Sequence, residues 1–149
     1  MTSAVLDTNV VVSAHIQPAG IPARILLLAF ANEFKLYTSS SIVAEYDDVL
    51  RRPKFKIKSD IVDGFLKAVS TTAVAVEPTI VIRAAKDPDD DTFLECAFEI
   101  QADYLVNGNL KDYPTATPSG FSGHDARGRV IEGRTRIVSP REFLQVIES

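Results

Sequence analysis

Acidic side chains crowd one short stretch of the chain, where Asp87, Asp89, Asp90 and Asp91 fall within five positions. An apolar, helix-forming run, TFLECAFEIQA, follows at once. Acids near a helix N-terminus are stabilised by the helix dipole, by roughly 0.3–1 kcal/mol each. That effect accounts for one or two carboxylates but not for four, because each added carboxylate repels the others. We therefore expect Asp91 to serve a function, and Asp89 and Asp90 to lie in solvated loop.

The chemistry that suits such acids is the binding of a divalent cation together with carboxylates from other segments. Mg²⁺ and Mn²⁺ prefer oxygen ligands and bind through a few carboxylates plus water. Asp7 ends an apolar run, and Glu45 lies next to the apolar stripe of a predicted helix, so its side chain would point towards the sheet. Taken alone, an aspartate at a strand end is often a turn former, and a helical glutamate is usually on the surface. We therefore state as a hypothesis that Asp7, Glu45 and Asp91 come together in the fold and share one metal ion.

The elements that must position these acids alternate along the chain between strands and helices. Apolar runs predict strands at AVL, KLYTS, AVAVEP, DYLVNG and TRIV, and helices at PARILLLAFANEF, SSIVAEYDDVLRR, SDIVDGFLKAV, TFLECAFEIQA and PREFLQVI. This alternation indicates an α/β fold, a three-layer α/β/α domain with a central parallel sheet of four to five strands. Ligands of such folds bind beyond the carboxyl ends of the strands, where the strand order reverses. Asp7 and the NGN loop at residues 107–109 each end a predicted strand, so both are candidates for one crevice.

Local signals add detail at the helix starts and after the fourth strand. Thr92 with Glu95, and Ser139 with Glu142, fit capping boxes, in which a carboxylate stands three residues after a hydroxyl. Residues 114–133 are rich in Gly, Pro, Ser and Thr, and this composition predicts an irregular excursion.

Length and composition set the class of protein. The 149 residues, 46% apolar and 24% charged, predict a single domain over residues 1–149. The single cysteine, Cys96, cannot form an internal disulfide, and it lies in an apolar pattern. No apolar run approaches the ~18 residues of a membrane span. The N-terminus does not resemble a signal peptide. We therefore expect a reducing, cytoplasmic location. The net charge of −4 argues against a purely electrostatic nucleic-acid binder, although RRPKFKIK and RGRVIEGRTR are basic blocks.

Four blocks in order resemble the PIN-domain family: LDTNVVVSA, SSSIVAEYDDVLRRPKF, DPDDDTFLECAFEIQADYLVNGNLKDYP and IVSPREFL. More narrowly, they are similar to its toxin–antitoxin toxins, the VapC-like ribonucleases. The resemblance spans nearly the whole chain, with residues 115–134 poorly matched. It implies a PIN-like, Rossmann-like fold, Mg²⁺- or Mn²⁺-dependent cleavage of RNA, a small antitoxin protein as partner, and a homodimer.

The resemblance also implies roles for single positions. Asp7 matches the family's first acid and Asn9 the adjacent polar position, while Glu45 matches the second acid. Asp91 matches the third, because counting back from the NGN loop without gaps ends there.

The fourth acid of the family departs from its pattern here. It usually falls two residues after a Thr or Ser, and in this chain the pair is Asn107 and Asn109. An asparagine offers a carbonyl oxygen to a metal or a water but brings no negative charge, so a second metal should be held less tightly. Asp112, three residues on, is a candidate to reach in instead, and the number of ions stays open.

Binding of the RNA backbone would require cations beside the acidic site. Arg51 and Arg52 are our candidates for phosphate contacts, with Asn9 beside them, and Phe55 could stack on a base or pack in the core. His15 and His124 are expected to be ordinary polar positions.

Three alternatives stay open on the sequence. One is another doubly wound phosphoryl-transfer domain, a receiver or a haloacid-dehalogenase-like phosphatase, which would need a paired acid where LDTNV offers only Asp7. The second is a catalytically weakened PIN domain that acts as an RNA- or protein-binding module, which Asn109 would permit. The third is a structural α/β domain whose acids never meet.

Overall fold

The computed structural model describes all 149 residues, and at its centre lies a parallel sheet with strand order β3-β2-β1-β4-β8. The strands are β1 (Ser3–Leu6), β2 (Lys35–Thr38), β3 (Val74–Ala75), β4 (Tyr104–Val106) and β8 (Arg136–Val138). Every neighbouring pair in this sheet is parallel. The central strands β1 and β4 are almost entirely buried, which explains why they are apolar at successive positions.

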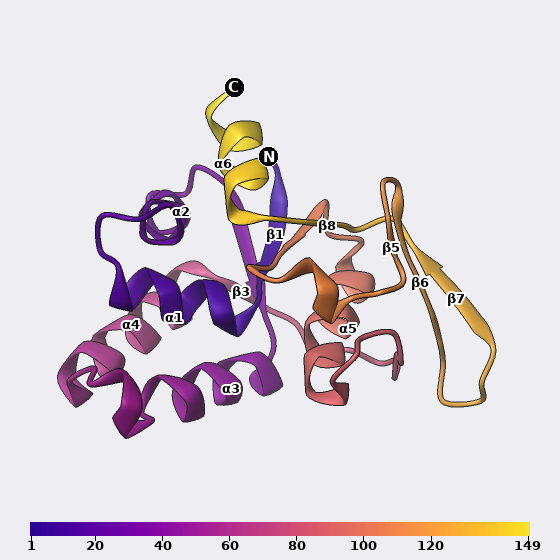
Figure 1. Ribbon diagram of the computed structural model, residues 1–149, viewed down its shortest axis with the longest axis horizontal. Helices are drawn as coiled ribbons and strands as arrows, with labels where there is room; N and C mark the ends of the chain where they lie inside the picture. Colours follow the sequence, from indigo (N-terminus) through magenta and orange to yellow (C-terminus); the bar gives the residue numbers. More distant parts are fainter.

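Helices flank the sheet on both faces (Figure 1), so the predicted three-layer α/β/α fold is confirmed. They are α1 (Thr8–Ile16), α2 (Ile21–Phe30), α3 (Ser40–Leu50), α4 (Ser59–Thr72), α5 (Asp91–Ile100) and α6 (Pro140–Glu148). Three short 3₁₀ turns complete the connections: η1 (Pro53–Phe55), η2 (Pro88–Asp90) and η3 (Leu110–Asp112). No single helix is long and apolar enough to cross a membrane, and α1 and α2, which would qualify only as a pair, meet at 105°.

Helix α1, which begins directly after Asp7, is absent from the predicted helices. Its sequence TNVVVSAHI is rich in β-branched residues, which have weak helical preference. Val10, Val11 and Val12 are consecutive and all buried, so the helix lacks the polar stripe that would identify it in a sequence.

The two predicted capping boxes have different outcomes. At α6 the cap is confirmed, because Ser139 Oγ accepts a hydrogen bond from the Glu142 N–H at 3.2 Å. At α5 the prediction is wrong, because the helix already begins at Asp91 and Thr92 lies inside its first turn. The Glu95 carboxylate instead accepts from the backbone N–H of Ile82 at 3.0 Å, so it holds the preceding loop.

Residues 114–133 form a second, antiparallel sheet and not the predicted irregular excursion. Its strands are β5 (Ala116–Thr117), β6 (Gly120–His124) and β7 (Val130–Gly133), and Figure 1 shows it extending beside α5. Its glycines permit close packing, since a Cβ at Gly133 would lie 2.2 Å from the ring of Phe121, which is buried. The composition that suggested irregularity is thus explained by tight turns and close contact.

The order of strands reverses between β1 and β4. The chain runs from β1 outwards to β2 and β3 on one side, and from β4 to β8 on the other. Leu6 pairs with Val106 in this central register, and the Asp7 N–H donates to the Val106 carbonyl at 2.9 Å. The carboxyl ends of β1 and β4 therefore place Asp7 and Asn107 side by side at the position where α/β folds bind ligands.

Candidate metal centre

Asp7 stands at this reversal point and is only 3% exposed. The hydroxyl of Tyr113, also buried, donates to Asp7 Oδ2 at 2.8 Å. The hydroxyl of Tyr46 donates to the carbonyl of Leu6, one residue earlier. Burial, against the lowering effect of the Tyr113 hydrogen bond and together with the charge of Asp112, raises the pKa of Asp7 to about 6. Asp7 is therefore a carboxylate held in place while largely deprived of water.

Asp91, the predicted third acid, is turned towards the loop that precedes it. Its Oδ1 accepts hydrogen bonds from the backbone N–H groups of Ala84 at 3.0 Å and Ala85 at 2.7 Å. Asp91 is buried, so these bonds fix the start of α5 to residues 84–85. The role of Asp91 as a metal ligand stays a prediction, because only Oδ1 is used in these bonds and Asp91 lines one pocket together with Glu45.

Asp90 is the neighbouring acid that shares the surroundings of Asp7. Burial, and after it the charges of Asp7 and Asp112, raise the pKa of Asp90 to about 7. The prediction that Asp90 lies in solvated loop is wrong, because Asp90 ends the turn η2 half-buried, and its carbonyl lies 3.1 Å from the Tyr113 hydroxyl that also binds Asp7. Asp89 is exposed as expected. Successive residues at a helix start point in different directions, so a shift of one position changes which acid faces the crevice.

Glu45 lies at the margin of this group. Its side chain is half-buried on α3, and its pKa is raised first by burial and then by the charge of Asp89. Glu45 is also among the charges that raise the pKa of Asp90. It therefore contributes to the same negative field without a direct contact to Asp7.

The NGN loop supplies an amide network. Asn107 is fully buried, and its Nδ2 donates to the carbonyl of Asn109 at 3.0 Å, with Asp112 Oδ2 at 3.5 Å. Asn109 Nδ2 donates to Asp112 Oδ1 at 3.2 Å. Asn9 closes the network, because its Nδ2 donates to Asn107 Oδ1 while its Oδ1 accepts from the Gly108 N–H at 2.9 Å.

This network bears on the prediction that Asp112 takes the place of the fourth acid, which stays a prediction. Asn109 orients Asp112, and the charge of Asp112 acts on both Asp7 and Asp90. Three aspartates, Asp7, Asp90 and Asp112, thus form the acidic group at the strand ends, with Glu45 beside them.

The predicted cations differ in how they lie relative to the acids. Arg51 forms ion pairs with Asp47 at 2.5 Å and with Asp63 at 2.6 Å, so its guanidinium joins α3 to α4. Arg52 pairs with Asp48 at 3.2 Å, and its charge lowers the pKa of Glu45 against the effect of burial. Of the two, Arg52 is the one whose field reaches the acidic group.

The remaining aromatic and histidine side chains have ordinary surroundings. Phe55 is partly buried and packs against the core, with Lys54 Nζ 5.0 Å from its ring centre. His15 Nδ1 lies 2.8 Å from the carbonyl of Val11. Tyr113 is the site residue that sequence reasoning missed, and nothing in the string DYP marks its hydroxyl as the partner of Asp7.

The donor set fits a hard divalent cation. No three His, Cys, Asp or Glu side chains lie close enough together to hold one ion directly. Mg²⁺, however, is commonly bound through one or two carboxylates and several waters. The raised pKa values of Asp7 and Asp90 show carboxylates that are short of water and repel each other, so a cation would relieve both costs. Asp7 and Asp90, with Asp112 nearby, are the residues that would hold it.

We expect the stability of the metal-free protein to depend on these carboxylates. An acid whose folded pKa is raised stabilises the fold fully below its unfolded pKa, and this contribution is lost as the pH rises through the folded value. For Asp7, raised from 3.8 to about 6, the loss is on the order of 3 kcal/mol. In EDTA, the melting temperature of Asp7→Asn relative to that of the wild type should therefore increase as the pH rises from about 4 to about 6. A melting difference that does not change with pH would contradict the burial of an ionised Asp7.

Fold and site together define an α/β domain with an aspartate-lined crevice at the reversal of its parallel sheet. The family model of the PIN domain matches residues 3–111, so the chain belongs to the PIN-domain family. This membership decides against a receiver or a haloacid-dehalogenase-like phosphatase. The convergence of Asp7, Glu45 and Asp91 on one ion stays a prediction.

Two individual proteins are similar to the chain. An uncharacterized protein of Methanocaldococcus jannaschii, MJ1680, is 37% identical over 147 residues, spanning 97% of this chain and 90% of the relative. Among solved structures, the crystal structure of VapBC2 from Rickettsia felis bound to a DNA fragment from their promoter matches at 18% identity. That match has a TM-score of 0.49 and covers 74% of this chain and 90% of the other.

Proposed function

We propose that this protein is an endoribonuclease that hydrolyses RNA phosphodiesters with the help of Mg²⁺ or Mn²⁺, and that it is the toxin of a toxin–antitoxin pair. The observation that carries the proposal is the Tyr113 hydroxyl at the strand reversal of a PIN domain, 2.8 Å from Asp7 Oδ2 and 3.1 Å from the Asp90 carbonyl, which places the two aspartates close together. Burial and like charge raise the pKa of both. Half-buried and buried carboxylates of like charge are suited to a bound cation, because the ion would offset both their lost hydration and their repulsion.

Each residue would have a distinct part in the reaction. A bound divalent ion supplies polarisation of the scissile phosphate and a lowered pKa for an attacking water. Asp7 and Asp90 would hold that ion, and Asp112 and Glu45 would add negative charge around it. Tyr113 keeps the Asp7 carboxylate in one orientation, and burial together with the Asp7 charge raises the pKa of Tyr113, so it stays a donor. Arg52 lies where it could meet a phosphate of the substrate.

Incubation with mixed cellular RNAs tests this function. We expect the wild type to cleave with Mn²⁺ and not with EDTA, and Asp7→Asn to lose at least about a hundredfold of the rate, as expected for an ion that supplies several kcal/mol of transition-state stabilisation. Equal cleavage by wild type and Asp7→Asn would point to a contaminant and count against the proposal. So would intact RNA under every divalent ion tried.

A second candidate function is an RNA- or protein-binding module with weakened catalysis. Two observations favour it: Asn109 stands at the usual fourth acidic position, and no three acids converge for direct coordination. The same incubation separates the candidates, because a binding module would retain RNA in a mobility-shift assay without Mn²⁺-dependent products.

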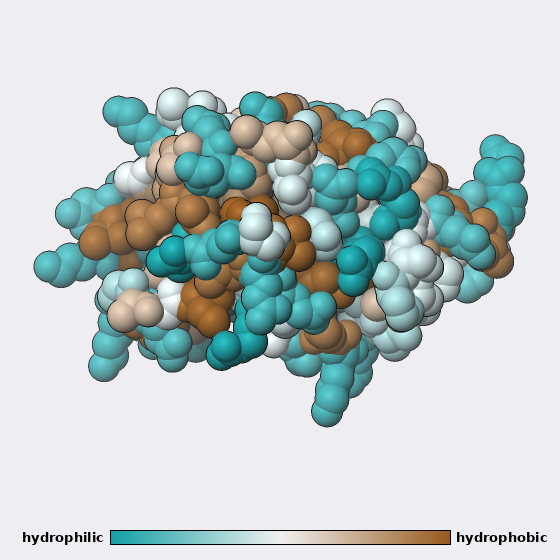
Figure 2. All heavy atoms as spheres, turned by 90° about the horizontal axis from the view of Figure 1, so that it is seen from above, coloured by the Kyte–Doolittle hydropathy of each residue, from teal (hydrophilic) through white to brown (hydrophobic).

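Binding of the proposed antitoxin and formation of the proposed homodimer each require an exposed surface on this chain. An apolar groove of about 360 Å³ lies between α1, α2 and α4, with Leu27 and Ile61 68% and 52% exposed. Figure 2 shows a brown area on the side of the molecule where Figure 1 places α2. Light scattering of the purified chain, alone and with the product of a neighbouring gene, tests both partners. A monomer that binds no such product would contradict them.

A further inference from the structure

A cleft of about 540 Å³ opens beside the candidate metal centre, between η3, β5, β8 and the first turn of α6. Tyr113 joins the two places, because its side chain lines the cleft while its hydroxyl reaches Asp7. The walls formed by β5, β8 and α6 lie beyond residue 111, where the match to the PIN domain ends. The cleft is therefore built largely by the part of the chain that the family comparison leaves out.

The cleft carries free positive charge. Lys111 and Arg136 both line it, and neither lies within 4.0 Å of a carboxylate. Arg136 is positioned by Tyr104, with its guanidinium carbon 5.9 Å from the ring centre. Glu142 is the single acid among the lining residues. Two unpaired cations against one acid favour an anionic occupant.

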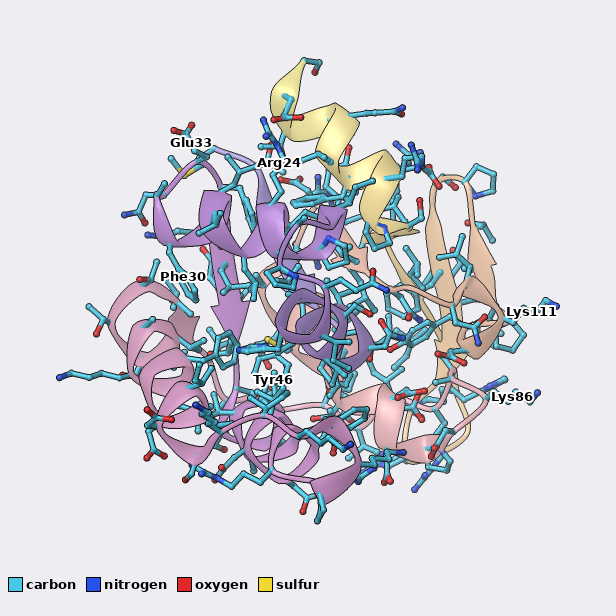
Figure 3. The ribbon with its side chains drawn as sticks, turned by 60° about the vertical axis from the view of Figure 1, so that its left-hand side comes forward. Arg24, Phe30, Glu33, Tyr46, Lys86 and Lys111 are labelled. Carbon is cyan, nitrogen blue, oxygen red and sulfur yellow. The ribbon has the colours of Figure 1, made fainter.

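A third cation continues this positive edge towards the acids. The Lys86 N–H donates to the carbonyl of Asp112 at 2.7 Å, so its loop is tied to the loop of Lys111. Figure 3 shows Lys86 and Lys111 on the same side of the molecule, both reaching outwards. A chain of phosphates could therefore pass from the acidic crevice into the cleft along unpaired lysines.

The remaining walls are apolar and suited to a flat ring. Leu110 is 42% exposed at the cleft, and Pro114 and Pro118 line it as well. A base in a duplex has both faces covered by its neighbours, whereas an unstacked base of a single strand can place a face on such side chains.

We propose that this cleft binds one nucleotide of a single-stranded RNA, next to the phosphate held at the acidic crevice. Lys111 and Arg136 contact its phosphates, and Leu110 contacts its base. This assignment rests on the proposed function, because it takes RNA as the ligand of the crevice.

The test measures binding of a fluorescent single-stranded RNA by anisotropy across a salt series. All variants are made in the Asp7→Asn background, which keeps the RNA intact whether or not the wild type cleaves. Lys111→Gln should reduce the slope of log affinity against log salt by about 0.7, the loss of one phosphate contact on a single strand. Leu110→Ala should weaken binding about fivefold, through lost apolar contact, and leave the slope unchanged. Lys67→Gln, an exposed charge on α4, is the matched control and should change neither quantity.

The cleft assignment is overturned if Lys111→Gln alters the slope no more than Lys67→Gln does, or if Leu110→Ala binds like its parent. It is also overturned if these variants lose a protein partner while RNA binding is untouched. Failure of the ribonuclease proposal looks different. In that case the wild type leaves RNA intact with Mn²⁺, yet the effects of Lys111→Gln and Leu110→Ala persist.

Discussion

Asp90→Asn should abolish metal-dependent cleavage, by at least about a hundredfold, while its metal-free form melts at a higher temperature than the wild type. The rise follows because burial and the charge of Asp7 oppose ionisation of Asp90, so removing the charge relieves the folded state. Asp90 is only half-buried, so solvent screening limits the gain to a few degrees, roughly 1 kcal/mol. Stabilisation by Mn²⁺, which depends on binding to the folded state, should largely disappear. Differential scanning fluorimetry with and without Mn²⁺ measures both effects.

Asp89→Asn is the matched control, because it removes the same charge one residue earlier from an exposed side chain. It should keep both cleavage and the response to Mn²⁺. Asp91→Ala should differ from both by melting lower, since the N–H groups of Ala84 and Ala85 lose their acceptor, at about 1–3 kcal/mol. If Asp90→Asn behaved like Asp89→Asn and responded fully to Mn²⁺, Asp90 would have no part in the site.

Gly123→Val should produce the largest loss of stability, lowering the melting temperature by about 5 °C or more. A Cβ at this position would lie 2.8 Å from Ala84 Cβ and 2.9 Å from the Arg83 carbonyl oxygen. Neither neighbour is a flexible side-chain end, so β6 would have to move away from residues 83–84. The N–H of Ala84 also holds Asp91 at the start of α5. The increase in melting temperature that Mn²⁺ causes should therefore be smaller in Gly123→Val than in the wild type.

Gly64→Ala provides the comparison for this variant. Gly64 lies in α4 with nothing within 4 Å of an added Cβ, so alanine should stabilise the helix by roughly 0.5–1 kcal/mol. The response to Mn²⁺ should be unchanged. If Gly123→Val had the same melting temperature as the wild type, β6 would not be closely packed against residues 83–84.

The position of the candidate site was predictable from the sequence, whereas the half-buried state of Asp90 and the contact of Tyr113 with Asp7 were not. Apolar runs that end at Asp7 and at the NGN loop identify two parallel strands, and the rule for strand reversal brings their ends together. Counting back from the NGN loop without gaps identified Asp91 as the third acid. Such counting does not show in which direction each side chain points at the start of the helix. The side chains in the sequence also give no sign of the two backbone N–H groups, those of Ala84 and Ala85, that fix one oxygen of Asp91.

Other parts of the fold were hidden for similar reasons. The helix α1 has no polar stripe because it is buried at successive positions. The second sheet has short strands, and its glycines are placed by contacts that are distant along the chain, such as that of Gly133 with Phe121. Tyr113 approaches Asp7 only because the whole sheet places residues 106 positions apart in contact.

The reciprocal backbone pairing of Arg83 with His124, at 2.8 and 2.9 Å, links two segments that would otherwise fluctuate separately. Local opening of the β6–β7 hairpin exposes the amide of Arg83 in the same event, because its backbone partner is His124, whereas the amides of Ala84 and Ala85 are held by Asp91. Amide hydrogen exchange should then occur at a common rate for Arg83 and His124. The small sheet thus anchors the segment that leads to the acidic turn, and a ligand that slows opening of the hairpin should slow amide exchange at Arg83 as well.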